Sequence, residues 1–145
     1  MTIRIVQPGE GVLWNLGSQI TCKVPSDSTQ DEYTVLEVLL ETGQGSPLHV
    51  HHRESETLYV AQGECIVGNG EKTYAMPTGS VIVFEVDTPH FFRNAGPSKA
   101  KLIITAIPGG LDRYFEEINS ALQAGNTNNI ENINRKYEIE FMRVQ

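Results

Sequence analysis

The chain has 145 residues and a formal net charge of −7. This length suffices for one hydrophobic core, so we expect a single domain over residues 1–145. The acidic balance offers no basic stripe for phosphate groups, which argues against a nucleic-acid partner and against binding to an anionic membrane surface. The opening segment MTIRIVQPGEGV has no apolar run of signal-peptide length, so we expect a cytoplasmic protein.

From Gly11 to Pro108 the sequence predicts short strands joined by turns. Runs rich in Val, Ile, Leu, Thr and Tyr are bounded by Gly, Pro, Asn or Asp, and about eight to eleven strands fit this stretch. The segment YTVLEVLLE is apolar on both faces, so we expect it to be covered on both sides. The segment VGNGE predicts a hairpin turn, because Asn and Gly tolerate positive φ.

The segment HVHHRESE, which begins at His49, holds three of the four histidines of the chain. Side chains alternate along a strand, so His49 and His51 share one face and His52 points away. One interpretation is that these histidines are exposed near a turn and bind nothing. The other is that two imidazoles and a carboxylate converge on a transition-metal ion, a set that suits non-haem iron in particular.

Two glutamates follow the histidines, and one is the better candidate ligand. A four-residue hairpin loop after His51 would place Glu56 opposite His51 on the next strand, with Cβ atoms about 5 Å apart. Glu54 would lie within that loop and could not fold back over the histidine face, so we expect it to be solvated. His90, in the segment DTPHFFRN, could complete the group from a distant strand.

These residues resemble the two motifs of the cupin family, and the chain is similar to single-domain, quercetin dioxygenase-like cupins. The first motif (Gly, five residues, HxH, four residues, Glu, six residues, Gly) is met by Gly43, His49, His51, Glu56 and Gly63. The second (Gly, five residues, PxG, two residues, His, three residues, Asn) is met by Gly79, His90 and Asn94, whereas Glu85 and Asp87 replace its internal Pro and Gly. Asp tolerates the left-handed region, so we expect the turn before His90 to form.

The resemblance implies a mainly β fold, a single cupin jelly-roll β-barrel (double-stranded β-helix) over about residues 11–108. It also implies one divalent transition metal per subunit, with Fe, Mn, Ni, Co, Cu and Zn all open, held by His49, His51, Glu56 and His90. One or two coordination positions would remain for water, substrate or oxygen.

Residues 109–145 are predicted to form a C-terminal extension with a pair of short α-helices. The first helix has an apolar face made of Leu111, Tyr114, Phe115, Ile118 and Leu122, and Gly125 is placed as its cap. The second carries Ile130, Ile133 and Tyr137. We interpret both faces as packing surfaces rather than parts of a functional site.

Other single residues are given structural roles. Cys22 and Cys65 lack a CxxC pattern and are interpreted as buried free thiols. Glu37 is placed at the surface rather than beside a ligand. Five aromatic residues could line a pocket but are interpreted as core: Trp14, Phe84, Phe91, Phe92 and Phe141. The sequence leaves open whether Arg93 or Lys101 points into the barrel.

Three functions are compatible with these residues. The preferred one is a metal-dependent dioxygenase, quercetinase-like, that acts on a small enolisable or phenolic compound, with Glu56 as a ligand or as a general base of raised pKa. The alternatives are a non-catalytic binding cupin and a metal-dependent isomerase or hydrolase. We expect a small-molecule substrate and a homodimer, because the strand TLYVAQG is apolar on both faces and its outer face needs a partner.

Overall fold

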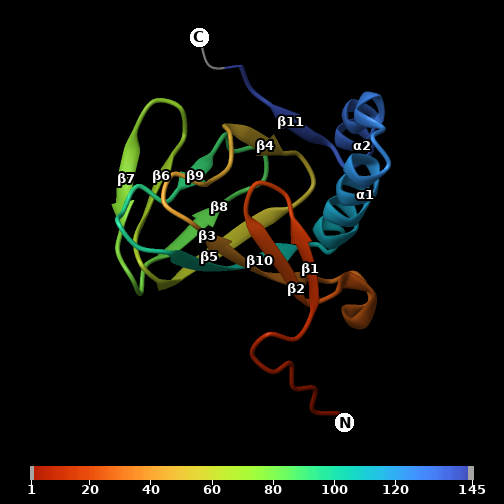
Figure 1. The fold of residues 1–145 in the computed structure, drawn as a ribbon, viewed down its shortest axis with the longest axis horizontal. Helices are drawn as coiled ribbons and strands as arrows, with labels where there is room; N and C mark the ends of the chain where they lie inside the picture. Colours follow the sequence, from red (N-terminus) through yellow and green to blue (C-terminus); the bar gives the residue numbers. More distant parts are fainter. Residues whose placement is uncertain (1, 144–145) are drawn as a thin grey trace.

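The structure, a computed structural model, describes residues 2–143 and consists mainly of antiparallel strands (Figure 1). The largest sheet has the order β1-β2-β3-β10-β5-β8, formed by β1 (Val12–Asn15), β2 (Gln19–Val24), β3 (Thr34–Leu40), β10 (Ala100–Ile107), β5 (Ser55–Gln62) and β8 (Val81–Phe84). A second sheet, in the order β7-β6-β9, is formed by β7 (Thr73–Met76), β6 (Cys65–Gly68) and β9 (Phe91–Arg93). The third pairs β11 (Ile139–Phe141) with β4 (His49–His51).

Strands β1, β2 and β3 are consecutive both in the chain and in the large sheet, whereas β10 and its two neighbours are far apart along the chain. β10 lies between β3 and β5 and pairs with both in antiparallel register. The described strands form three hydrogen-bonded sheets rather than one closed barrel, and the isolated bridges Gly45↔Arg93 and His49↔His90 connect segments outside the regular ladders. The mainly β fold with two short C-terminal helices is therefore confirmed, whereas strict closure of the barrel is not seen.

The hydrophobic core lies on the inner faces of β3, β5 and β10. Buried and half-buried residues alternate along β3, as expected of a strand with one face toward the core. The most deeply buried apolar side chains include Leu36, Leu40, Leu58, Val60 and Leu102, and burial of each contributes about 1.5–3 kcal/mol. The prediction that this strand is covered on both faces is only partly met, because Val35, Glu37 and Leu39 are half-buried.

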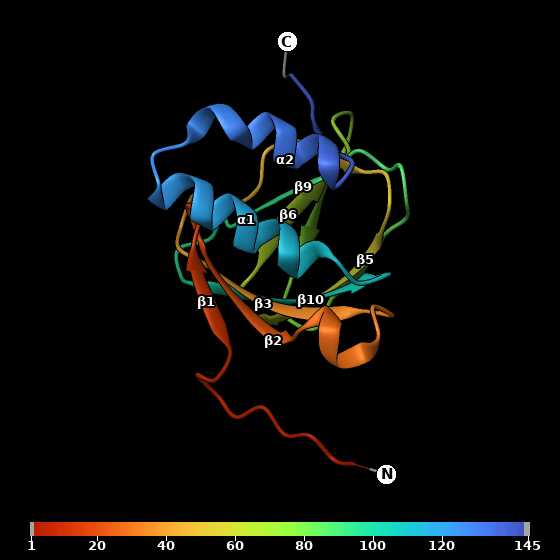
Figure 2. The same ribbon diagram turned by 90° about the vertical axis from the view of Figure 1, so that its right-hand side faces the viewer.

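Two helices, α1 (Leu111–Gln123) and α2 (Ile130–Lys136), lie side by side along one flank of the strands (Figure 2). Short 3₁₀ turns occupy Ser26–Thr29 and Thr127–Asn129. The start of α1 is anchored by Asp112, which accepts hydrogen bonds from the backbone nitrogen of Ser26 at 2.9 Å and from its hydroxyl group. Farther along, Trp14 Nε1 donates to the Glu116 carboxylate at 2.6 Å and so attaches α1 to β1.

The predicted apolar face of α1 is largely correct. Leu111, Tyr114 and Ile118 are buried, but Leu122 is 43% exposed and Ala121 is buried in its place. Just beyond the end of the helix, Gly125 adopts φ +69°, a conformation that glycine adopts without strain. Neither helix among residues 2–143 is long and apolar enough to cross a membrane.

Candidate metal centre

Four side chains that are far apart in the sequence meet in one buried group. His49 and His51 come from β4, Glu56 from β5, and His90 from the residue before β9. Each offers one ligand atom, and these atoms all lie within 4.8 Å of one another. All four residues are buried, with 2–6% of their surface exposed. The structure thus brings together every residue that the sequence proposed as a ligand.

Backbone pairing places the histidines beside one another. His49 and His90 form an isolated bridge, in which each backbone nitrogen donates to the carbonyl oxygen of the other at 3.0 and 2.9 Å. Their rings lie with centroids 4.4 Å apart. Strand alternation brings His51 to the same side as His49, while His52 is exposed as predicted.

The predicted hairpin between His51 and Glu56 is wrong. β4 pairs with β11, where His51 faces Ile139, and Glu56 pairs across the large sheet with Phe84 and Ala106. The chain leaves one sheet after His51 and enters another at Ser55, so the two side chains approach across a gap between sheets. Even so, His51 Nε2 lies 2.9 Å from Glu56 Oε1.

Each histidine is oriented by a hydrogen bond on its outer nitrogen. His49 Nδ1 donates to the carbonyl oxygen of Pro47 at 2.7 Å, and His90 Nδ1 donates to that of Thr88 at 2.8 Å. Because a carbonyl oxygen only accepts, Nδ1 carries the proton, and in the neutral ring Nε2 then has the lone pair. This arrangement directs Nε2 of both rings inward, as in metal-binding histidines.

Glu54 orients the third histidine, His51, and the sequence did not reveal this role of Glu54. Its Oε1 lies 3.0 Å from His51 Nδ1, and the residue is only 3% exposed. The prediction that Glu54 is solvated is therefore wrong. It rested on the hairpin loop, and in the actual crossing between sheets the side chain turns inward beneath His51. A carboxylate hydrogen-bonded to the outer nitrogen of a ligand histidine is a common partner in metal sites.

Burial and the charges of neighbouring residues together set the pKa values of the candidate ligands. Burial and the neighbouring His51 and His90 lower the pKa of His49 to about 4. Burial alone would lower the pKa of His51, but the carboxylates of Glu56 and Glu54 outweigh it and raise the value to about 9. Burial would raise the pKa of Glu56, whereas His51 and His90 lower it well below its usual range. The raised pKa expected of Glu56 as a general base is thus not found.

The donor set fits a divalent transition metal. Metal bonds to His and carboxylate ligands are about 2.0–2.2 Å long, so donors around one ion lie within about 4.4 Å of one another, and the observed spread of up to 4.8 Å is close to this. Glu56 Oε1 also lies 3.0 Å from His90 Nε2. His51 faces a carboxylate on each nitrogen and must carry a second proton to donate to both; a bound cation would take the place of that proton.

The departure from the second motif is accommodated by the backbone. Asp87 adopts φ 69°, the left-handed conformation that the motif provides through glycine. Its nitrogen donates to the carbonyl oxygen of His51 at 3.0 Å, and Thr88 nitrogen donates to that of Glu85 at 3.2 Å, which closes the turn. His52 Nδ1 contacts Asp87 Oδ1 at 2.6 Å and its Nε2 contacts Glu140 Oε2 at 3.0 Å, outside the ligand group. The expectation that the turn before His90 forms is confirmed.

Two further motif positions are structural. Asn94 is fully buried, and its Nδ2 donates to the carbonyl oxygens of Leu40 at 3.0 Å and Ser98 at 2.7 Å. Gly63 has φ +72°, and a Cβ atom there would lie 2.5 Å from the Lys99 carbonyl oxygen. Neither residue contacts the ligand group, so they shape the loops that connect the strands.

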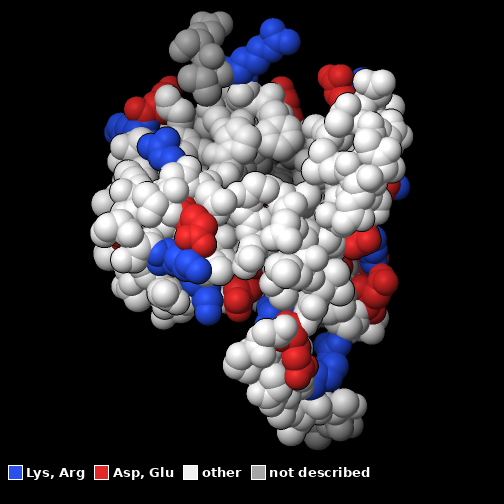
Figure 3. All heavy atoms as spheres, in the orientation of Figure 1, with Lys and Arg blue, Asp and Glu red and all other residues white. Residues whose placement is uncertain are grey.

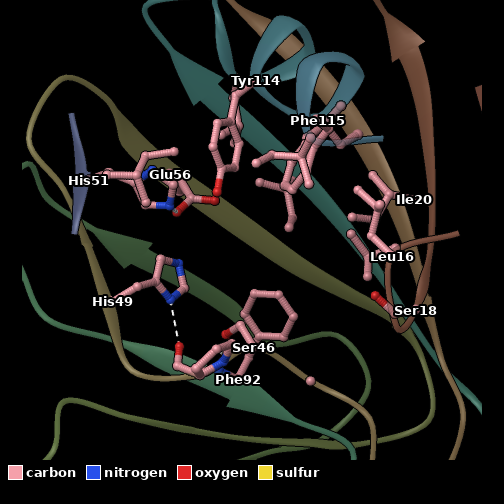
Figure 4. A pocket seen from close by; sticks show the side chains of 18 of the residues that line it. Leu16, Ser18, Ile20, Ser46, His49, His51, Glu56, Phe92, Tyr114 and Phe115 are labelled. Carbon is pink, nitrogen blue, oxygen red and sulfur yellow. Dashed lines mark hydrogen bonds and ion pairs between the residues drawn. The ribbon is translucent and has the colours of Figure 1, made fainter. Parts of the chain in front are cut away.

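A cavity of about 280 Å³ extends from the ligand group toward the helices. Figure 4 shows His49, His51 and Glu56 at one end, Leu16 and Ser18 at the other, and aromatic side chains along the walls. Tyr114, Phe115 and Ile118 of α1 contribute to one wall, so the face interpreted as packing surface also lines the cavity. Of the five aromatic residues interpreted as core, Phe92 and Phe141 line the cavity.

The remaining sequence candidates lie away from the cavity. Phe84 stacks on the His90 ring at 4.0 Å, and Trp14 belongs to the core. Cys22 and Cys65 are free and buried, as predicted. Glu37 is half-buried on the outer side of β3 and does not line the cavity.

Comparison with known proteins supports the fold. Residues 36–106 match the family described as "Cupin domain". Residues 36–106, which make up just under half of the chain, are therefore similar to a cupin domain. The mainly β cupin fold of the chain, the double-stranded β-helix, is thereby confirmed, and the matched segment includes all four candidate ligands. No curated protein matches the chain at a significant level.

Solved structures share this cupin fold at low sequence identity. A "predicted oxalate decarboxylase" from Thermotoga maritima is 17% identical, with a TM-score of 0.69 over 72% of this chain and 99% of its own. KdgF from Halomonas sp. is 19% identical, with a TM-score of 0.66 over 76% and 99%. The polyketide cyclase RemF from Streptomyces resistomycificus is 17% identical, with a TM-score of 0.64 over 73% and 80%. At such identities the similarity establishes the fold alone.

Proposed function

We propose that this cupin is a metal-dependent enzyme of dioxygenase type that acts on a small enolisable or phenolic compound. The observation that carries the proposal is that His49, His51 and Glu56, three members of the buried ligand group, lie at one end of an apolar cavity. Cupin folds accommodate many activities, so the argument rests on the site rather than on the fold.

The ligands are proposed to be His49, His51, Glu56 and His90, which would hold one divalent transition metal. When bound, the metal would activate an enol or phenol oxygen as a Lewis acid and allow reaction with O₂. The hydrogen bonds that His49 and His90 donate to the carbonyl oxygens of Pro47 and Thr88 keep these two imidazoles in the orientation that binding requires. The apolar walls exclude water from the reacting compound.

Glu56 is proposed to accept the substrate proton as well as to bind the metal. Its carboxylate is fully buried at the cavity end and is held in its ionised form by His51 and His90. A proton on the enol or phenol hydroxyl would pass to a Glu56 oxygen. Transfer to a positioned base typically contributes about 10²–10⁴ in rate, and the lowered pKa of Glu56 makes it a weak base, so the lower end of this range is expected.

Oxygen uptake tests the proposed function. Metal-free protein is reconstituted separately with Fe(II), Mn(II), Co(II) and Ni(II), and uptake is measured with phenolic compounds and 1,3-diketones. We expect uptake with at least one metal, and its loss in Glu56→Gln protein that retains metal. The exposed His52→Gln variant is the matched control and should keep both metal and activity. Binding of the compounds without uptake in any metal form would favour the isomerase or binding function instead.

We also propose that the protein works as a homodimer. The outer face of the large sheet carries an apolar patch, formed by Tyr59, Val81, Val83 and Ile103. Tyr59 is 45% exposed, and Val81 and Val83 are each 61% exposed. Tyr59 pairs with Val81 on one side and with Ile103 on the other, so these side chains form a continuous row. Neither helix covers this face.

A further inference from the structure

The walls of the cavity offer very few free polar groups beyond the ligand cluster. Three of the lining residues carry hydroxyl groups: Ser18, Ser46 and Tyr114. The Tyr114 hydroxyl already donates to Asn134 Oδ1 at 2.7 Å, and Ser46 Oγ accepts from the Phe92 backbone nitrogen at 3.1 Å. Ser18, which lies at the end of the cavity away from the histidines (Figure 4), has no such bond among the described side-chain contacts.

Beyond the ligand group, the cavity also lacks a cationic side chain. None of the described residues that line it is Lys or Arg. The two candidates that the sequence left open do not point inward, because Arg93 is exposed, with its guanidinium 5.9 Å from the Phe91 ring centroid, and Lys101 lies on the outer, half-buried side of β10. Figure 3 shows uncharged side chains over most of the surface between the strands and the two helices. A buried anionic group would remain unpaired in this part of the cavity, which is costly.

The shape of the cavity indicates a small, flat ligand. Phe92 lies on one side of the space, and Tyr114 and Phe115 lie on the other (Figure 4). Aromatic side chains favour stacked or edge contacts with another ring. The volume of about 280 Å³ lies just below the range of about 300–1,000 Å³ that is usual for drug-sized ligands, so a single ring with a short substituent is the natural size.

We propose that this cavity selects an uncharged, mainly apolar compound of about one ring, with its enol or phenol oxygen toward the histidines and an apolar tail toward Leu16 and Ser18. Compounds with an anionic group on that tail are rejected. The inference rests on the proposed function in that it takes the metal-side cavity as the substrate site. It extends that function by stating that the tail of the ligand decides which compound binds, and that a negative charge on this tail prevents binding.

A matched pair of ligands tests the selection. 4-Propylcatechol and 3-(3,4-dihydroxyphenyl)propanoate share the ring and the metal-binding oxygens and differ in the carboxylate at the end of the tail. Binding to Zn(II)-loaded protein is measured by calorimetry and by the fluorescence of Trp14, whose ring centroid is 6.1 Å from that of Phe115. Zinc avoids turnover, and metal analysis after each titration verifies that the ion stays bound. We expect the propyl compound to bind at least tenfold more tightly.

A variant with a new cation in the cavity tests where the protein distinguishes the two ligands. Ser18→Lys places a cation at the far end of the cavity and should reduce the difference between the two ligands severalfold. Ser98→Lys adds the same charge at an exposed loop that does not line the cavity and should leave the difference unchanged. Melting curves of both variants verify folding. A preference that is unchanged in Ser18→Lys protein would place the ligand elsewhere and overturn the proposal.

The failure of this inference and that of the proposed function are distinguishable. If the propyl compound binds tenfold more tightly but no metal form takes up oxygen, the proposed ligand selection is supported and the proposed dioxygenase function is rejected. Equal or tighter binding of the carboxylate compound, or no binding of either to protein that retains zinc, would overturn the selection. If the protein then takes up oxygen with the carboxylate compound, the proposed dioxygenase function is still supported.

Discussion

At the scale of single residues, the buried carboxylate of Glu54 distinguishes His51 from the other two histidines. His49 and His90 donate to backbone carbonyl groups, whereas His51 donates to a charged side chain. A carboxylate partner makes an imidazole a stronger ligand than a carbonyl group does. His51 is therefore the histidine whose contribution to metal binding depends on a side chain that mutation can change.

Replacement of Glu54 by Gln should weaken metal binding about 10–100-fold, the usual cost of losing such a partner. Competition with a chromophoric chelator measures the affinity. Glu71→Gln removes an exposed carboxylate from the turn between β6 and β7 and serves as the control. Metal affinity equal to wild type in Glu54→Gln protein would show that the contact with His51 does not support the site.

The stability of the metal-free protein should depend on pH through His51. Its pKa rises from 6.5 to about 9 on folding, so folded protein binds this proton more tightly than unfolded protein does. The contribution is complete below pH 6.5 and is lost as the pH rises toward 9. The unfolding midpoint in EDTA should fall over this interval, and His51→Gln should flatten the fall. A midpoint that rises in wild-type protein would contradict the assignment.

At the scale of elements, β11 supports the strand that carries two of the candidate ligands. Ile139 faces His51 across the pair, is 5% exposed, and lines the cavity. The backbone nitrogen of Met142 also donates to the Leu48 carbonyl oxygen at 2.9 Å, just before β4 begins. The C-terminal part of the chain thus holds His49 and His51 in place from one edge.

Ile139→Ala should lower the free energy of unfolding of metal-free protein by about 2–4 kcal/mol, because a buried isoleucine is truncated next to a cavity that cannot fully collapse. It should also weaken metal binding, because β4 loses side-chain packing against β11. Urea unfolding and chelator competition measure the two effects. The exposed Glu131→Ala on α2 is the control. Full metal affinity in destabilised Ile139→Ala protein would show that β11 supports the fold but not the site.

The candidate ligands were predictable from the sequence because their spacing is local or matches a family motif. Alternation along one strand separates His49 and His51 from His52, and the motif adds Glu56 and His90. The role of Glu54 was not predictable, since it depends on how the chain crosses between two sheets after β4. Strand β11 was also missed, because three residues after a helix carry too little pattern to indicate which strand they will join.

The role of α1 as a wall of the cavity was also not predictable from the sequence. The spacing of Tyr114, Phe115 and Ile118 predicts a helix with one apolar face, and the structure confirms that helix. Spacing does not tell whether such a face packs fully on the strands or leaves a space. Here α1 is held at its start by Asp112 and near its middle by the hydrogen bond from Trp14 to Glu116, and its residues Tyr114, Phe115 and Ile118 border the cavity.

At the scale of the whole molecule, the outer patch of Tyr59, Val81, Val83 and Ile103 remains to be covered. The N-terminal segment before β1 extends away from the body of the molecule (Figures 1 and 2), with Ile3 and Ile5 89% and 70% exposed, so it does not cover the patch of its own chain. A second copy would bury the same patch on both sides of a two-fold axis. We therefore expect the apolar row on β5 and β8 to lie at the centre of a dimer interface.

Light scattering at micromolar concentration should give about twice the chain mass of 16.1 kDa. Val83→Lys should shift the mass toward the monomer, because two such charges would meet at the two-fold interface without partners. Val12→Lys is the matched control, since Val12 is 55% exposed on β1 at the opposite edge of the same sheet. A monomer mass for the wild-type protein would contradict the dimer. A dimer that survives Val83→Lys but dissociates in Val12→Lys would move the interface to the other edge of the sheet.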